Sequence, residues 1–206
     1  MLIVDKEIRE LCRNRWVKNF PGGVIPPMID PFSEAVSGNG IISYGLTSAG
    51  YDIRLAPEVL IFKNTSSECI DPKRFSDDVY KKEMFDELLV YTVGNDQFVT
   101  IPPHSYVLGR SYEYLRIPKN LKVRAVGKST LARSGILINC CPGEPEWEGH
   151  LVLEIGNITP CSAILYIMQG ISQLEFEVLS DNPETSYKDK KGKYQGQTGV
   201  TLAKVL

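Results

Sequence analysis

The sequence has few of the residues that build metal centres. Among its 206 residues there are only two histidines, His104 and His150, and neither lies in an H-x-E or H-E-x-x-H pattern. None of the five cysteines forms a C-x-x-C pair. A structural or catalytic zinc site is therefore not expected. The odd cysteine count fits a reducing compartment, and we expect a cytoplasmic protein.

Long apolar runs are also missing. No segment approaches the length of a membrane span, and no apolar stretch follows a basic start, so neither a membrane anchor nor a signal peptide is expected. Lys and Arg total 23 against 25 Asp and Glu, without the basic excess typical of general nucleic-acid-binding proteins. With 43% hydrophobic and 23% charged residues, the chain is expected to form one globular domain over residues 1–206.

Helix signals are scarce, and strand signals dominate. An apolar stripe after Asp5, the expected N-cap, predicts a helix to about residue 13. A short helix is also expected at 75–88, an irregular arm at 18–40 and a strand region at 48–60. Short alternating segments separated by Pro and Gly then predict strands at 97–101, 106–116, 120–126, 135–141, 151–155, 163–168 and 173–179. This spacing is typical of a mainly antiparallel β-sandwich or barrel.

The segment 127–135, GKSTLARSG, has the composition of a phosphate-binding turn. Lys128 precedes two hydroxyl residues, and Arg133 lies one helical turn after Ser129 on the same face. A Walker A motif would need a glycine where Lys122 stands, so a P-loop is excluded. Two interpretations stay open: a solvated turn leading into one turn of helix, or an anion site made by helix-start amides, Lys128, Ser129 and Arg133.

Residues 150–155 alternate in polarity as a half-buried strand does. Leu151, Leu153 and Ile155 share one face, and His150, Val152 and Glu154 share the other. Placing a carboxylate beside Val152 in an apolar strand costs free energy unless the carboxylate forms an ion pair or takes part in the function of the protein. Glu154 is therefore either a structural acid paired with a lysine or arginine, or a general acid and base with a raised pKa.

Three further features each have two interpretations. The polar residues 186–199 form either a mobile solvated end or a glycine-hinged lid that brings Lys193 and Gln197 to a nucleotide, with Tyr187 stacking there or merely packing. Gln173 faces outward from its strand, as a surface glutamine or as a base-reading amide. The loop 140–149 is a rigid connection, or it walls a pocket in which backbone groups near Cys141 face the reacting atom.

Four separated motifs, taken in order, resemble the dCTP deaminases of the trimeric dUTPase superfamily. They are GKST-x-AR at 127–133, EPEWEG at 144–149 with the strand end Leu153-Glu154, a Gly-x-x-Gln turn at 170–173, and a Tyr…GKYQGQ-GV-L tail at 187–202. An upstream segment at 43–54 matches as well. The resemblance covers most of the chain, and the ordered set is far more specific than any one motif.

The resemblance implies a distorted β-barrel of jelly-roll type, a dUTPase-like fold with a short N-terminal helix. It further implies a homotrimer with sites between neighbouring subunits, closed by the tail 186–206. The implied reaction is hydrolytic deamination of dCTP to dUTP and ammonia on the route to thymidylate. The family uses no zinc, unlike other nucleobase deaminases. Mg²⁺ would travel with the triphosphate, and inhibition by dTTP is expected as end-product control.

Residue roles follow from the same resemblance. Glu154 is the implied proton acceptor and donor, which activates water for attack at C4 and protonates N3 and the leaving amine. Ser129 and Arg133 are implied to order the water and the acid. The implied substrate contacts are Lys128, Ser129, Thr130, Leu131, Ala132, Arg133, Val152, Leu153, Glu154, Gln173, Tyr187, Lys193 and Gln197.

The chain departs from part of the family in one loop. Some members carry His-Arg-Ile-Asp before the Pro-x-Trp, whereas this loop is two residues shorter and places Glu144 near that aspartate. Bifunctional relatives use the aspartate to make dUMP and pyrophosphate, so a bifunctional enzyme is the alternative. A dUTP pyrophosphatase is less expected, because the tail lacks the phenylalanine of the dUTPase pattern. A non-catalytic nucleotide sensor is the third hypothesis.

Overall fold

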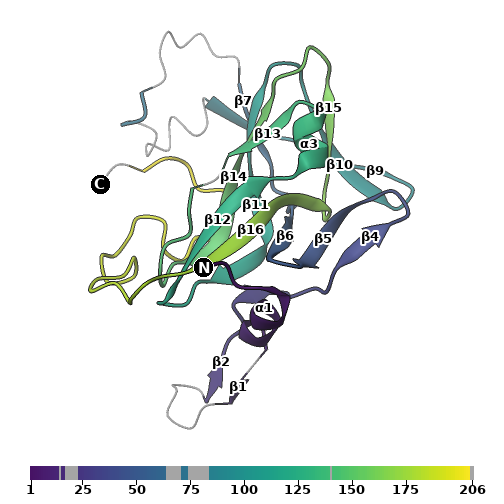
Figure 1. Ribbon diagram of the computed structural model, residues 1–206. Coiled ribbons are helices and arrows are strands. Elements are labelled where there is room, and N and C mark those ends of the chain that lie inside the picture. Colours follow the sequence, from purple (N-terminus) through teal and green to yellow (C-terminus); the bar gives the residue numbers. More distant parts are fainter. Residues whose placement is uncertain (14, 17–22, 64–70, 74–83, 140, 205–206) are drawn as a thin grey trace.

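The computed structural model describes residues 1–13, 15–16, 23–63, 71–73, 84–139 and 141–204 (Figure 1). The described helices are α1 (Asp5–Leu11) and α3 (Ser129–Arg133). The strands are β1 (Arg15–Trp16), β2 (Val24–Ile25), β3 (Ile29–Asp30), β4 (Val36–Gly38), β5 (Ile41–Thr47), β6 (Gly50–Arg54), β7 (Leu60–Phe62), β8 (Phe85–Glu87), β9 (Tyr91–Val93), β10 (Asp96–Ile101), β11 (Tyr106–Arg116), β12 (Leu121–Gly127), β13 (Ile136–Asn139), β14 (Glu148–Asn157), β15 (Ala163–Tyr166) and β16 (Gly170–Val178).

Two larger antiparallel sheets form the body of the molecule. One has the order β12-β16-β6-β5-β4, and the other has the order β13-β14-β11-β7-β8 with β3 also paired to β11. A three-stranded sheet, β15-β10-β9, lies beside them, while α1 and the β1–β2 pair project from one end (Figure 1). The mainly β, antiparallel architecture predicted from the sequence is confirmed.

The main core joins the two larger sheets. A single buried cluster contains Ile53 and Phe176 from one sheet and Leu153 and Ile155 from the other. A smaller cluster packs the C-terminal segment, which is the described part of the tail (residues 186–204), against the second sheet. Its buried members are Met84, Phe85, Leu108, Val200 and Leu202. Val200 and Leu202 are therefore held in place by burial of apolar surface.

The alternation predicted around Glu154 is present in β14. Leu151 is 5% exposed and Leu153 and Ile155 are fully buried, whereas Val152 and Glu154 are half-buried. β11 pairs with β14 on one side, opposite Glu154 through Leu108, and β13 pairs on the other. Because neighbours on both sides fix the register, the carboxylate has a defined position.

The structure corrects three predictions near the N-terminal half. The N-cap of α1 is Val4 rather than Asp5, and the Val4 N–H donates to Glu7 Oε2 at 3.0 Å. Residues 85–87 form β8, not a helix, because they pair with β7; residues 75–83 of that predicted helix lie outside the described part. The expected arm at 18–40 contains the short strands β2, β3 and β4 in its described part.

No helix in the described ranges is both long and apolar enough to span a bilayer.

A buried ion pair ties the two larger sheets together. The Glu113 side chain on β11 is completely buried and accepts hydrogen bonds from Arg54 Nε at 2.6 Å and from the Arg54 backbone N–H at 2.9 Å. The guanidinium carbon lies 4.9 Å from the ring centre of Tyr44 and 4.6 Å from that of Tyr112. Burial raises the pKa of Glu113, and the hydrogen bonds from Arg54 oppose that rise. The pair therefore depends on both partners being present.

Replacing Arg54 with Met is expected to reduce the free energy of unfolding by about 3–5 kcal/mol, because it leaves a buried carboxylate unpaired. Urea denaturation measures the loss. The double variant Arg54→Met, Glu113→Gln removes the uncompensated charge and should recover part of it. If Arg54→Met lowers the free energy of unfolding by less than about 1 kcal/mol, as expected for an exposed ion pair, the pair does not tie the two sheets together.

Candidate active site

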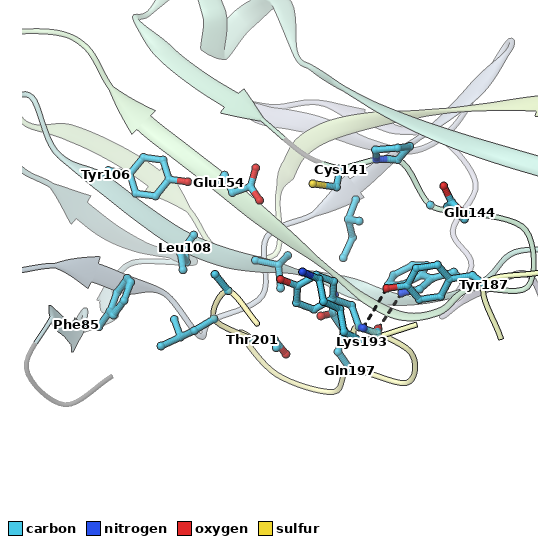
Figure 2. A pocket seen from close by; sticks show the side chains of 18 of the residues that line it. Phe85, Tyr106, Leu108, Cys141, Glu144, Glu154, Tyr187, Lys193, Gln197 and Thr201 are labelled. Carbon is cyan, nitrogen blue, oxygen red and sulfur yellow. Dashed lines mark hydrogen bonds between the residues drawn. The ribbon is translucent and has the colours of Figure 1, made fainter. Parts of the chain in front are cut away.

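A cavity of about 520 Å³ opens between β14, the loop after β13 and the C-terminal segment. This volume lies in the range of small-molecule sites. Its polar lining residues include Glu144, Glu154 and Lys193, and its apolar wall includes Leu108 and Val152. Figure 2 shows Glu154 on one side of the cavity and the C-terminal segment with Lys193 on the other.

Glu154 is one of two acids among the described residues that line this cavity. It is half-buried, and burial raises its pKa, while a hydrogen bond from Asn139 acts in the opposite direction. Among the described residues, no lysine or arginine forms an ion pair with it. Of the two interpretations of Glu154, the geometry favours the general acid and base.

Asn139 was missed by the sequence analysis. It ends β13 directly opposite Glu154 in the β13–β14 register, and its Nδ2 donates to Glu154 Oε2 at 2.5 Å. The sequence offers no signal for this contact, because the two residues are far apart and only the strand register brings them together.

The C-terminal segment is docked, not free in solvent, over its described length. The Trp147 indole N–H donates to the Tyr194 carbonyl at 2.9 Å, and the Tyr194 N–H donates to the Tyr187 hydroxyl at 3.1 Å. A methyl group added at Gly192 would lie 2.1 Å from the Tyr187 ring, so only glycine fits there. These contacts attach the tail to the loop before β14.

Gln197 anchors the same segment to β14. Its carbonyl accepts from the His150 N–H at 2.9 Å, and its Nε2 donates to the His150 carbonyl at 2.7 Å. Glu58 adds another anchor, since it accepts from the Val200 N–H at 3.1 Å while paired with Arg110 at 2.9 Å. The tail thus lines the cavity through a set of specific hydrogen bonds.

The structure divides the predicted site residues into two groups. Five of them line the cavity: Val152, Glu154, Tyr187, Lys193 and Gln197. The other eight are not among its lining residues: Lys128, Ser129, Thr130, Leu131, Ala132, Arg133, Leu153 and Gln173. Gln173 faces outward on β16, where its Nε2 lies 3.4 Å from Thr47 Oγ1.

The segment 127–135 contains the predicted turn of helix, α3, and its side chains differ in their exposure to solvent. Ser129, Thr130, Ala132 and Arg133 are exposed, whereas Leu131 is 5% exposed and belongs to the core. The Lys128 ammonium is bound by the Asp52 carboxylate and by Ser43 Oγ. Lys128 therefore already has polar partners in this structure, and its predicted contact with phosphate stays a prediction.

The side chains of Leu131 and Leu153 are buried in the core, and neither residue lines the cavity. In the part of the chain that the structure describes, no group of three His, Cys, Asp or Glu side chains is placed to hold a metal ion.

Comparisons with known proteins agree on one family. A family model described as dCTP deaminase-like matches residues 28–179. A dCTP deaminase of Helicobacter hepaticus is 46% identical over 179 residues, covering 87% of this chain and 91% of the relative. A dCTP deaminase of Gemmatimonas aurantiaca is 45% identical over 195 residues, covering 95% of this chain and 99% of the relative. One from Erythrobacter litoralis is 43% identical over 204 residues, covering 99% of each.

A solved structure supports the fold. The 2′-deoxycytidine 5′-triphosphate deaminase of Agrobacterium tumefaciens superposes with a TM-score of 0.51 at 19% identity, over 86% of this chain. The match spans 47% of that protein's chain, about half its length. The mainly β fold expected from the sequence is shared with that deaminase. With a matching family model over most of its length and relatives above 40% identity, the chain belongs to the dCTP deaminase-like family.

Proposed function

We propose that this chain hydrolyses the C4 amine of dCTP and releases dUTP and ammonia. Membership of the family supports the reaction, and one structural observation supports the role of Glu154. A half-buried carboxylate without a cationic partner among the described residues faces a cavity large enough for a nucleoside. Burial keeps its proton affinity high enough for it to serve as both base and acid.

Glu154 would move both protons of the reaction. It accepts a proton from water as the C4–O bond forms and passes this proton to N3. The hydroxyl of the tetrahedral adduct then gives its proton to Glu154, which delivers it to the amine. The C4–N bond breaks, ammonia leaves and the C4 carbonyl remains. One carboxylate therefore balances both steps without any net change in its own protonation.

The described cavity lacks the charge to hold a triphosphate by itself. Of its described lining residues, Lys193 is the one cation, and its Nζ donates to the Lys204 carbonyl. Mg²⁺ bound to the nucleotide, as part of the substrate, would offset some of the negative charge. The rest must come from outside the cavity of one subunit.

We therefore keep the prediction of a homotrimer with sites between subunits. Ser129 and Arg133 are exposed on α3 and do not line the cavity of their own chain. A neighbouring copy that brings its α3 to this cavity would supply the missing cation and hydroxyl. The tail would then enclose the nucleotide from the other side, as the docked position of residues 186–204 supports.

The alternatives receive less support. The relatives described above carry the name of the deaminase alone, so a second reaction at Glu144 has no support from them. Inhibition by dTTP remains a prediction from the resemblance. A cytoplasmic location and a single domain over residues 1–206 also remain predictions.

The proposed reaction is tested by incubating the purified chain with dCTP and Mg²⁺ and assaying ammonia and pyrophosphate separately. Ammonia with accumulating dUTP is the expected result. Pyrophosphate and dUMP in equal amounts would instead indicate the bifunctional enzyme. Binding of dCTP without either product would indicate a nucleotide sensor and contradict the proposal.

A further inference from the structure

The strand that follows α3 holds the catalytic carboxylate directly. β13 begins three residues after α3 ends, and its last residue, Asn139, lies opposite Glu154. Asn139 Nδ2 and Glu154 Oε2 are 2.5 Å apart, and no other hydrogen bond to the Glu154 side chain is found among the described residues. The carboxylate thus has one fixed oxygen, Oε2, and one oxygen without a partner there, Oε1.

The chemistry of this contact is asymmetric. An amide nitrogen only donates, and an ionised carboxylate only accepts, so the bond is strongest when Glu154 carries its charge. A proton placed on Oε2 would compete with the amide hydrogen for the same oxygen. The contact therefore directs proton uptake to Oε1.

Burial and the Asn139 amide shift the pKa of Glu154 in opposite directions. Burial favours the neutral acid, and the hydrogen bond from Asn139 favours the carboxylate. A group that must accept a proton and then release it works best when neither form is strongly preferred. Asn139 is the described side chain that supplies this opposing influence.

We propose that Asn139 is a positioning residue for the deamination, which holds Oε2 of Glu154 as an acceptor and leaves Oε1 to carry the proton. This inference rests on the function proposed above for Glu154. It adds an assignment of the two carboxylate oxygens and of the group that separates their roles. Asn139 itself is not among the residues that line the cavity.

The test compares the pH dependence of kcat/KM for Asn139→Leu, Asn139→Asp and Asn139→Gln in the full-length protein. Leucine has a similar volume and no donor, so the acidic limb should move to higher pH. On that limb kcat/KM should fall roughly tenfold, as expected for the loss of one hydrogen bond to a charged group, with little change on the alkaline plateau. Aspartate adds a like charge and should move the limb further, whereas glutamine keeps an amide donor and should restore part of the wild-type profile.

A purely structural role would lower kcat/KM by the same factor at every pH, and that result overturns the proposal. An unchanged profile in Asn139→Leu overturns it as well. Titration of the ¹³C-labelled Glu154 carboxyl by NMR gives a second readout that does not depend on turnover. Its midpoint should move to higher pH in Asn139→Leu, and a midpoint equal to that of the wild type would refute the assignment.

Parallel assays of Glu154→Gln distinguish a failure of the proposed role of Glu154 from a failure of the positioning role of Asn139. If that variant turns over normally, the proposed role of Glu154 is wrong and the role of Asn139 falls with it. If Glu154→Gln is inactive while Asn139→Leu keeps the wild-type profile and titration, only the positioning role is wrong.

Discussion

Replacing Glu154 with Gln is expected to lower kcat for dCTP by about 10²–10⁴-fold while leaving nucleotide affinity close to that of the wild type. Glutamine keeps the shape of the side chain and its place opposite Asn139, but it can neither take a proton from water nor pass one to the amine. Rates come from ammonia release, and affinity comes from calorimetry with dCTP and Mg²⁺.

Glu144→Gln is the matched control. It removes the other described carboxylate of the cavity, and it should leave kcat within a few-fold of the wild type, because Glu144 has no part in the proton transfers. Near-wild-type turnover in Glu154→Gln would rule out the proposed role. A comparable loss in both variants would show that the negative charge of the cavity matters, and not the proton transfer.

Replacing Arg133 with Ala is expected to reduce kcat/KM for dCTP by roughly 10²–10³-fold, through both weaker binding and slower chemistry. A guanidinium donates to phosphate or carboxylate through a rigid fork, which no other side chain reproduces. Steady-state kinetics over a range of dCTP concentrations separate the two contributions.

Two controls accompany that variant. Arg133→Lys keeps the charge without the fork and should have an intermediate effect. Arg124→Ala removes an exposed arginine from β12 and should have little effect. Unchanged kinetics in Arg133→Ala would remove this residue from the site and with it the reason for placing α3 at a neighbouring cavity.

Local sequence patterns predict much of this fold, and strand pairing explains the failures. The strand 106–116 matches β11, because a long run of alternating polarity has one favourable register with a buried face. The direction in which Glu154 points follows from the same alternation in β14. The helix expected at 75–88 fails at β8, where pairing with β7 overrides local helical preference.

In the candidate site, too, local sequence patterns predict some features, whereas others depend on strand pairing. The motifs point to Glu154, which lines the cavity, and to Arg133, which does not line the cavity of its own chain. They give no information on the surroundings of either residue. Lys128 resembles a phosphate ligand in its motif, yet its partner Asp52 lies 76 positions earlier in the chain and only the folded sheet brings them together. Asn139 could not be found from spacing for the same reason, since its contact with Glu154 depends on the β13–β14 register.

In the proposed trimer, the proton-transferring Glu154 of one subunit lies beside the Arg133 of another. Co-expression of Glu154→Gln and Arg133→Ala chains tests this most directly. Each variant alone should be nearly inactive. If equal amounts of the two chains assemble at random, roughly a quarter of all sites take wild-type Glu154 from one chain and wild-type Arg133 from its neighbour, so roughly a quarter of the wild-type activity should return. If the mixed sample stays as inactive as the separate variants, although tagged subunits show that mixed oligomers form, the site between subunits is refuted.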